Sequence, residues 1–228
     1  MTIIFKPSPA LKFRQGIFVC YAIRSYSALD KLCTVWYTTP MSNRETILAC
    51  ALQLFSARGY DAVGVQEIVE AVGIQKPTLY HYFGSKAGLL HSLLAENFAP
   101  LFAELEKAVA YRHDVKAALE AVTIIYFDFA RKNPGFYRLQ LALWFGAPDS
   151  EPYIAVVGFN QLQQELLEGL FYQASLDHGN MKDRQKSYAA TFLGMVNTYA
   201  ALGLNGFVNL DPPLVYTAVH QFMHGIFS

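Results

Sequence analysis

Apolar residues recur at helical spacing along most of the chain from Ser42 onwards. The first such segment opens with Ser42 and Glu45, and their S-x-x-E spacing is that of a capping box, in which each side chain bonds the backbone amide of the other. Gly59 follows the last apolar position, where a helix can end. The pattern therefore predicts a capped helix that stops before Gly59. The residues that form its apolar face are Ile47, Leu48, Ala51, Leu54 and Phe55.

Two short helices with a tight turn between them are predicted over residues 66–86. Gly73 ends the first helix, since glycine adopts a left-handed conformation without steric cost. Pro77 sits in the first turn of the second, where no N–H partner is needed, and Leu79 and Phe83 lie one turn apart and face inward. The remaining outer face carries one cation, several donors and no carboxylate, as expected of a recognition helix entering a DNA major groove. The alternative is a helical hairpin whose polar face only meets water.

Longer apolar stripes follow, and they predict an all-α chain. The first stripe runs from Leu89 to Val109, and Pro100 within it should kink or break the helix. The breaks between later stripes fall at Asn, Gly and Pro residues, which favour turns. The further helices are predicted at about 114–132, 136–145, 152–176, 183–204 and 213–227.

The charge balance limits the kind of nucleic-acid binding to expect. The chain has 228 residues, 53% of them hydrophobic, with 18 Lys and Arg against 18 Asp and Glu. Residues 41–110 hold five Lys and Arg against seven Asp and Glu, a net charge of −2. A non-specific nucleic-acid binder is usually more basic. Sequence-specific binding stays open, because it depends on a few placed cations and hydrogen-bond donors.

Signals for redox, metal or catalytic chemistry are few. Cys20, Cys33 and Cys50 have no metal-ligand spacing and leave an odd thiol if two pair, so a reduced cytoplasm is the expected setting. His220 and His224 lie one helical turn apart without a third ligand nearby, so no metal site is expected. Common catalytic motifs and phosphate-binding glycine loops are missing, so we expect no cofactor and no enzymatic activity. No apolar run approaches the roughly 18 residues of a transmembrane helix.

Several short runs resemble a known family. They are Arg44-Glu45-Thr46-Ile47-Leu48, Ala51-Leu52-Gln53-Leu54-Phe55, Arg58-Gly59-Tyr60, Gln66-Glu67-Ile68, Gly73-Ile74 and Pro77-Thr78-Leu79-Tyr80-His81-Tyr82-Phe83-Gly84-Ser85-Lys86. Over roughly residues 42 to 95, the chain resembles the DNA-binding half of the TetR (tetracycline-repressor) family of bacterial transcription regulators. The resemblance implies a three-helix helix-turn-helix DNA-binding domain at residues 41–90. It also implies a larger C-terminal helical domain for ligand binding and dimerisation at residues 91–228.

Residues 1–40 lie outside this resemblance. Met41 stands where chains similar to this family tend to begin. We therefore expect residues 1–40 to be a poorly ordered extension or a mis-assigned start. The alternative is a basic arm that touches DNA, because five Lys and Arg face one Asp in this segment.

The resemblance, together with the chemistry of the outer face, predicts the DNA contacts. Lys76 is expected to read guanine, whose O6 and N7 accept hydrogen bonds from a cation. Gln66 could reach an adenine edge or a phosphate, while Lys86 and Tyr82 position the DNA backbone. Gly64 stands where similar sequences often carry a hydroxyl, so one phosphate contact is in question. The predicted DNA-facing residues are Gln66, Lys76, Pro77, Thr78, Tyr80, His81, Tyr82 and Lys86.

Aromatic residues crowd the C-terminal half of the chain. Core packing is the simplest interpretation of any single one. As a set they suit a largely apolar pocket with a few hydrogen-bonding tips. The residues predicted to line such a pocket are Tyr126, Phe129, Tyr137, Gln140, Trp144, Phe171 and Asn197.

The last two predicted helices are too apolar for lone surface helices. Two such pairs can cover one another as a four-helix bundle about a two-fold axis, and the resemblance implies dimerisation there. The alternative is that both helices close the core of the monomer. The residues predicted at the dimer interface are Phe192, Met195, Tyr199, Val219 and Phe222.

These features predict a ligand-responsive transcription regulator. We expect a homodimeric repressor that leaves a palindromic operator in double-stranded DNA when a small, largely apolar effector binds the C-terminal domain. One alternative is a helical enzyme or carrier with a vestigial helix-turn-helix, which would need convergent titratable residues that the sequence does not show. The other is a constitutive DNA binder with a filled core. No membrane partner is expected.

Overall fold

A computed structural model describes residues 42–225. Within that range every regular element is helical, which confirms the predicted all-α class. The elements are α1 (Asn43–Arg58), α2 (Val65–Val72), α3 (Lys76–Phe83), α4 (Lys86–Ala108), α5 (Val115–Lys132), α6 (Pro134–Trp144), α7 (Glu151–Asp177), the 3₁₀ turn η2 (Gly179–Met181), α8 (Gln185–Leu204) and α9 (Pro212–His224). The expectations for residues 1–40, and for the end of the last helix at Phe227, lie outside the described residues.

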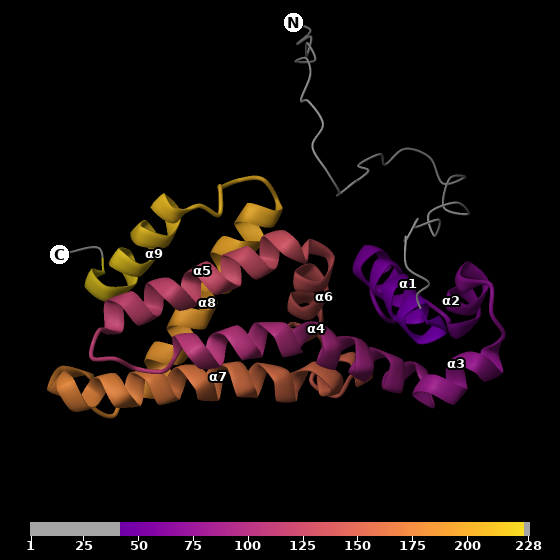
Figure 1. Ribbon diagram of the computed structural model, residues 1–228, viewed down its shortest axis with the longest axis horizontal. Helices are drawn as coiled ribbons and strands as arrows, with labels where there is room; N and C mark the ends of the chain where they lie inside the picture. The colour runs from indigo at the N-terminus through magenta and orange to yellow at the C-terminus, as the bar shows by residue number, and fades with distance from the viewer. Residues whose placement is uncertain (1–41, 226–228) are drawn as a thin grey trace, which may run out of the picture. The chain divides into compact units, whose positions relative to one another are not determined.

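Helices α1 to α3, residues 43–83, form a small helical unit that we call the head (Figure 1). The capping box of α1 is present, since the Ser42 amide donates to Glu45 Oε2 at 2.9 Å and the Glu45 amide donates to Ser42 Oγ at 3.3 Å. The Ser42 bonds to this carboxylate, with the charge of Arg44, lower the pKa of Glu45. Gly73 ends α2 in the left-handed conformation, with φ +78°. The predicted starts and stops of these helices therefore follow from local chemistry.

Helix α4 leads from the head into the rest of the chain without interruption. The sequence predicted a kink or a break at Pro100, and the break is wrong, because Pro100 lies inside the helix and is exposed to solvent. A proline removes one backbone hydrogen bond from a helix interior. Packing outweighs that loss, because leucines on both sides of Pro100 are buried and α4 packs on α5 and α7. These leucines are Leu93, Leu94, Leu101 and Leu105.

Helices α5 to α9, residues 115–224, form what we call the body. Its most extensive contacts join α7 to α8 and α4 to α7, while α5 packs on α4, α8 and α9. Figure 1 shows α5 running above α4, with α7 alongside α4. The centre is aromatic, with the Phe98 ring stacked on Phe159 at 5.0 Å and edge-on to Phe136 at 5.0 Å. Rings from α4, α6 and α7 thus meet in one core.

Candidate nucleic-acid interface and helical core

Helix α3 presents one side to the head and the other to solvent. Leu79 and Phe83 are buried against α1, α2 and α4. On the solvent side Tyr80 is 44% exposed and Tyr82 is 40% exposed. Thr78 is half-buried, and the predicted contacts that are exposed on this helix are Lys76, Pro77, Tyr80, His81 and Tyr82. The exposed side thus offers a cation, a histidine and two phenolic hydroxyls, with no carboxylate on α3 itself.

Gln66 is exposed on α2, and its side-chain amide donates to Glu70 one turn later. The acidic side chain beside it disfavours an approaching phosphate. Gly64 precedes α2 as its N-cap without any side-chain hydrogen bond, as the sequence predicts. Gln66 is therefore better suited to a base edge than to the DNA backbone.

Lys86 points inward rather than freely to solvent. Its Nζ donates to the carbonyl oxygen of Tyr60 at 2.7 Å and lies 3.9 Å from the centroid of the Tyr60 ring. The predicted phosphate contact of Lys86 would therefore come in addition to its bond to Tyr60. An ammonium has three N–H groups, so one bond to Tyr60 leaves two to donate elsewhere.

Gly88 in the first turn of α4 is a position that no side chain fits. A Cβ there would lie 2.0 Å from the carbonyl oxygen of Phe83, at the end of α3. The Gly88 amide donates to Ser85 Oγ at 2.9 Å, which caps α4. The glycine therefore allows α3 to end directly against the start of α4.

The predicted pocket residues divide into separate groups in the body. The Tyr126 hydroxyl donates to Gln163 Oε1 at 2.9 Å, and the Tyr137 hydroxyl donates to Asn197 Oδ1 at 2.7 Å. Burial raises the pKa of both tyrosines, which keeps their hydroxyls neutral. Phe129 contacts the Tyr137 ring at 6.3 Å. Phe129 and Asn197 are thus joined through Tyr137, while Tyr126 forms a separate pair with Gln163.

Three predicted pocket residues lie apart from these pairs. Phe171 packs on the rings of Phe192 and Phe222, at 6.3 Å and 5.9 Å, in a different cluster. Trp144 stacks on Tyr153 at 5.7 Å, where α6 leads into α7. Gln140 is buried on α6.

Comparison with known proteins gives the family. The family model described as "Bacterial regulatory proteins, tetR family" matches residues 47–93, which span the head and the start of α4. The chain belongs to the TetR family of transcriptional regulators. It is thus a DNA-binding regulator of a non-enzymatic family, and this sets aside the helical-enzyme alternative.

Its relatives extend the match beyond the head. The transcriptional activator FasR of Mycolicibacterium smegmatis is 26% identical over 182 residues, 80% of this chain and 81% of that protein. The transcriptional repressor KstR2 of Rhodococcus jostii is 35% identical over 92 residues, 40% of this chain and 45% of that one. The structure of the regulator FadR from Bacillus subtilis, in complex with stearoyl-CoA, has a TM-score of 0.67 at 18% identity, covering 79% of this chain and 97% of that one. This last likeness shows the shared fold.

The predicted dimer residues of this TetR-family regulator are partly wrong. Phe192 and Val219 are fully buried within the single chain, and the Phe192 ring meets Phe222 at 5.1 Å. Such side chains belong to the core of the protomer and cannot reach a second copy. Met195, Tyr199 and Phe222 are half-buried. The apolar pattern identified a buried face correctly, but the regulator's own helices bury it.

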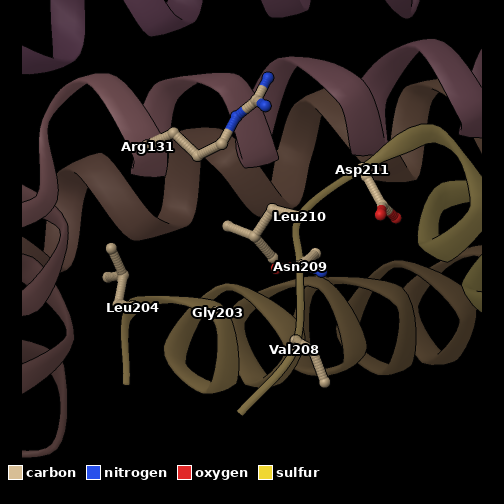
Figure 2. A pocket seen from close by; sticks show the side chains of 7 residues that line it. All are labelled: Arg131, Gly203, Leu204, Val208, Asn209, Leu210 and Asp211. Atoms are coloured by element: carbon tan, nitrogen blue, oxygen red, sulfur yellow. The ribbon is translucent and has the colours of Figure 1, made fainter. Parts of the chain in front are cut away.

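A surface hollow of about 280 Å³ lies beside the turn between α8 and α9 (Figure 2). None of the predicted pocket residues lines it. Arg131 lies on α5 across the hollow from α8, and Figure 2 shows its guanidinium directed away from Gly203 and Leu204. The residues that line the hollow are Arg131, Gly203, Leu204, Val208, Asn209, Leu210 and Asp211.

Residues 42–225 of the regulator offer neither a metal site nor a membrane span. Within them, no three His, Cys, Asp or Glu side chains are grouped so as to hold a metal ion. Over the same range, none of the helices combines the length and apolar character needed to cross a bilayer.

Sequence reasoning missed Gln163, which lies among the buried residues of α7 and binds Tyr126. Glutamine is usually exposed, so residue type gave no signal. The spacing of Gln163 did indicate burial. It lies on one helical face with Val156, Leu167 and Leu170, and all four residues are buried.

Proposed function

We propose that this TetR-family regulator is a homodimeric repressor that leaves a palindromic operator when a small, largely apolar effector binds its C-terminal helices. The division into a DNA-binding domain at residues 41–90 and an effector-binding and dimerisation domain at residues 91–228 belongs to this proposal. So does a cytoplasmic location, where it would meet its DNA. The observation that carries it is the exposed side of α3, which bears a cation and donors above buried Leu79 and Phe83.

In this proposal α3 enters the major groove of the operator. Lys76, exposed in the first turn of α3, donates to guanine O6 or N7. Gln66 contacts an adenine edge from α2. Tyr82 and the remaining N–H groups of Lys86 bind phosphates, which set the register without reading sequence.

The dimer interface is proposed on the outward faces of α8 and α9 rather than on their buried faces. Beyond the first turn of α8 the exposed residues are small, so a second helix can approach closely. They are Ala190, Thr191, Gly194 and Thr198. On α9 the exposed face carries larger side chains, Tyr216, His220 and Met223. Two copies of this pair would form a four-helix bundle about a two-fold axis.

The effector is proposed to carry a long acyl chain. The body stacks phenylalanines of α4 and α7 in its core, and it also holds two polar pairs, Tyr126–Gln163 and Tyr137–Asn197. Apolar walls with a few placed hydrogen-bonding groups suit such a molecule. FadR of Bacillus subtilis, which shares the fold, was crystallised with stearoyl-CoA. An effector can release DNA only through a difference in affinity between two conformations.

The test is operator release. A fluorescent operator, recovered by selection from random duplexes, is titrated with the protein in the presence of stearoyl-CoA or of coenzyme A alone. We expect stearoyl-CoA to weaken operator binding about 5- to 150-fold, the usual range of allosteric coupling, and coenzyme A to leave it unchanged. Operator binding that resists acyl-CoA thioesters of every chain length would contradict the acyl effector.

Constitutive binding is the second candidate, and the packing of the body favours it. Tyr126 and Tyr137 are fully buried with their hydroxyls already bonded. A core filled in this way needs no ligand for its stability. Thermal unfolding distinguishes the two, because a ligand that binds the native state raises the melting temperature with its concentration. A constitutive binder would show no such rise with stearoyl-CoA.

A further inference from the structure

Tyr60, in the turn between α1 and α2, connects the head to the body. Its side chain is 4% exposed and packs on the Phe55 ring at 5.1 Å. Its hydroxyl donates to Glu151, the first residue of α7, which lies 91 positions further along the chain. The head therefore contacts the body by a polar bond that does not pass through α4.

On its other side Tyr60 holds Lys86, the first residue of α4. The Lys86 ammonium lies over the Tyr60 ring and donates to the Tyr60 carbonyl, as described above. Only two residues separate the end of α3 from the start of α4. A chain of contacts thus runs from Glu151 through Tyr60 to Lys86, and so from the first turn of α7 to the base of the recognition helix.

Other contacts surround this chain. Helix α1 packs on α6, and the start of α6 lies so close to α1 that a Cβ on Gly135 would be 3.3 Å from Ser56 Oγ. At the junction between α6 and α7, Trp144 stacks on Tyr153, and Tyr153 lies two residues after Glu151. A shift of this junction would therefore act on Tyr60 directly.

The hydroxyl is suited to a lasting bond. Burial and the neighbouring Glu151 carboxylate raise the pKa of Tyr60, so the phenol stays a neutral donor at physiological pH. The bond then responds to movement of α7 rather than to proton concentration.

We propose that Tyr60, through its bond to Glu151, is a positioning residue that couples the conformation of the body to the DNA-binding head. The inference rests on the proposed operator binding and names a route for its regulation. Coupling of this kind is reciprocal. If the body biases the head through Tyr60, then DNA bound to the head must change the α6–α7 junction through the same residue.

The fluorescence emission of Trp144 reports on the α6–α7 junction. It can therefore measure the effect of bound DNA on that junction although the effector is not identified. In a Trp36→Phe background Trp144 is the only tryptophan, since the chain has two. We expect saturating operator to change its emission. The change should fall by at least half in Tyr60→Phe and in Glu151→Ala, and no further in the double variant. Glu151→Gln, which keeps an acceptor for the hydroxyl, should retain most of it.

Matched controls come from elsewhere on α7. Tyr172→Phe and Glu165→Ala alter exposed side chains of the same helix, and both should keep the full change in emission. All variants are compared at saturating operator, so differences in their affinity for DNA do not alter the size of the emission change. A full change in Tyr60→Phe would overturn the proposal, as would equal losses in the control variants.

A DNA-free measurement separates this proposal from that of operator binding. Amide hydrogen exchange reports local opening. Tyr60→Phe should speed exchange in the first turn of α7, and Glu151→Ala should speed it in residues 59–64, with no change in the controls. Failure to bind any DNA would remove the proposed function but leave this result to decide the coupling. Unchanged exchange across the contact in both variants would overturn it.

Discussion

Gly88 shows how one residue sets the geometry of the DNA-binding head. Its missing side chain lets α4 begin against the last carbonyl groups of α3. Gly88→Ala should destabilise the fold by about 1–3 kcal/mol, the usual cost of overpacking, as measured by thermal unfolding. Gly158→Ala is the control, because nothing lies within 4 Å of a Cβ added at that position on α7. It should stabilise by about 0.5–1 kcal/mol, and equal effects at both sites would contradict the account.

Lys86 serves two partners, and a substitution can separate them. Lys86→Met keeps an aliphatic chain over the Tyr60 ring but removes the ammonium. We expect weaker binding to all DNA sequences alike, with the salt dependence of log K reduced by about one. Binding measured by fluorescence anisotropy at several salt concentrations checks this. An unchanged salt slope would mean that the ammonium serves only the Tyr60 carbonyl.

Residue-scale features were predictable where the chemistry is local. Ser42, Glu45 and Gly73 act through neighbours in sequence, so the capping box and the turn followed from spacing alone. The direction of Lys86 was not predictable, because its partner Tyr60 lies 26 residues away. The bond from Tyr60 to Glu151 spans 91 residues and left no local signal at all.

Helices α8 and α9 show the corresponding limit at the scale of elements. Their apolar spacing predicted buried faces, and those faces are buried. Spacing does not say what covers a face, so Phe192 was assigned to the dimer although α7 and α9 cover it. Likewise Pro100 predicted a kink or a break, and α4 does not break there, because it is packed on both sides of the proline. Tertiary contacts decided both cases.

The outward face of α8 is where we expect a charge to separate the dimer. Gly194 is exposed, with nothing within 4 Å of an added Cβ, so Gly194→Arg should fold normally as a single chain. It should sediment as a monomer and lose high-affinity operator binding. Gly169→Arg on α7, which is equally open, is the matched control and should stay dimeric. A dimer in Gly194→Arg would place the interface elsewhere.

At the scale of the whole molecule, the head and the body differ in how much the sequence reveals. The head follows a motif that the sequence carries in full, and the family model matches it over residues 47–93. The body has the fold of distant relatives, but its interior depends on contacts such as Tyr126 with Gln163, between residues 37 positions apart. The kind of regulator was therefore readable from sequence, whereas the lining of its core was not.

Selection of bound duplexes from a random DNA pool tests the central claim most directly. The full chain should enrich a two-fold symmetric site whose half-sites lie about one helical turn apart, or a multiple of it. The Lys76→Met variant should enrich a related site that has lost its preference for guanine at one position of each half-site. Methionine cannot donate the hydrogen bond that Lys76 is proposed to make to guanine O6 or N7. An enriched site without symmetry, or one that Lys76→Met leaves unchanged, would contradict the account.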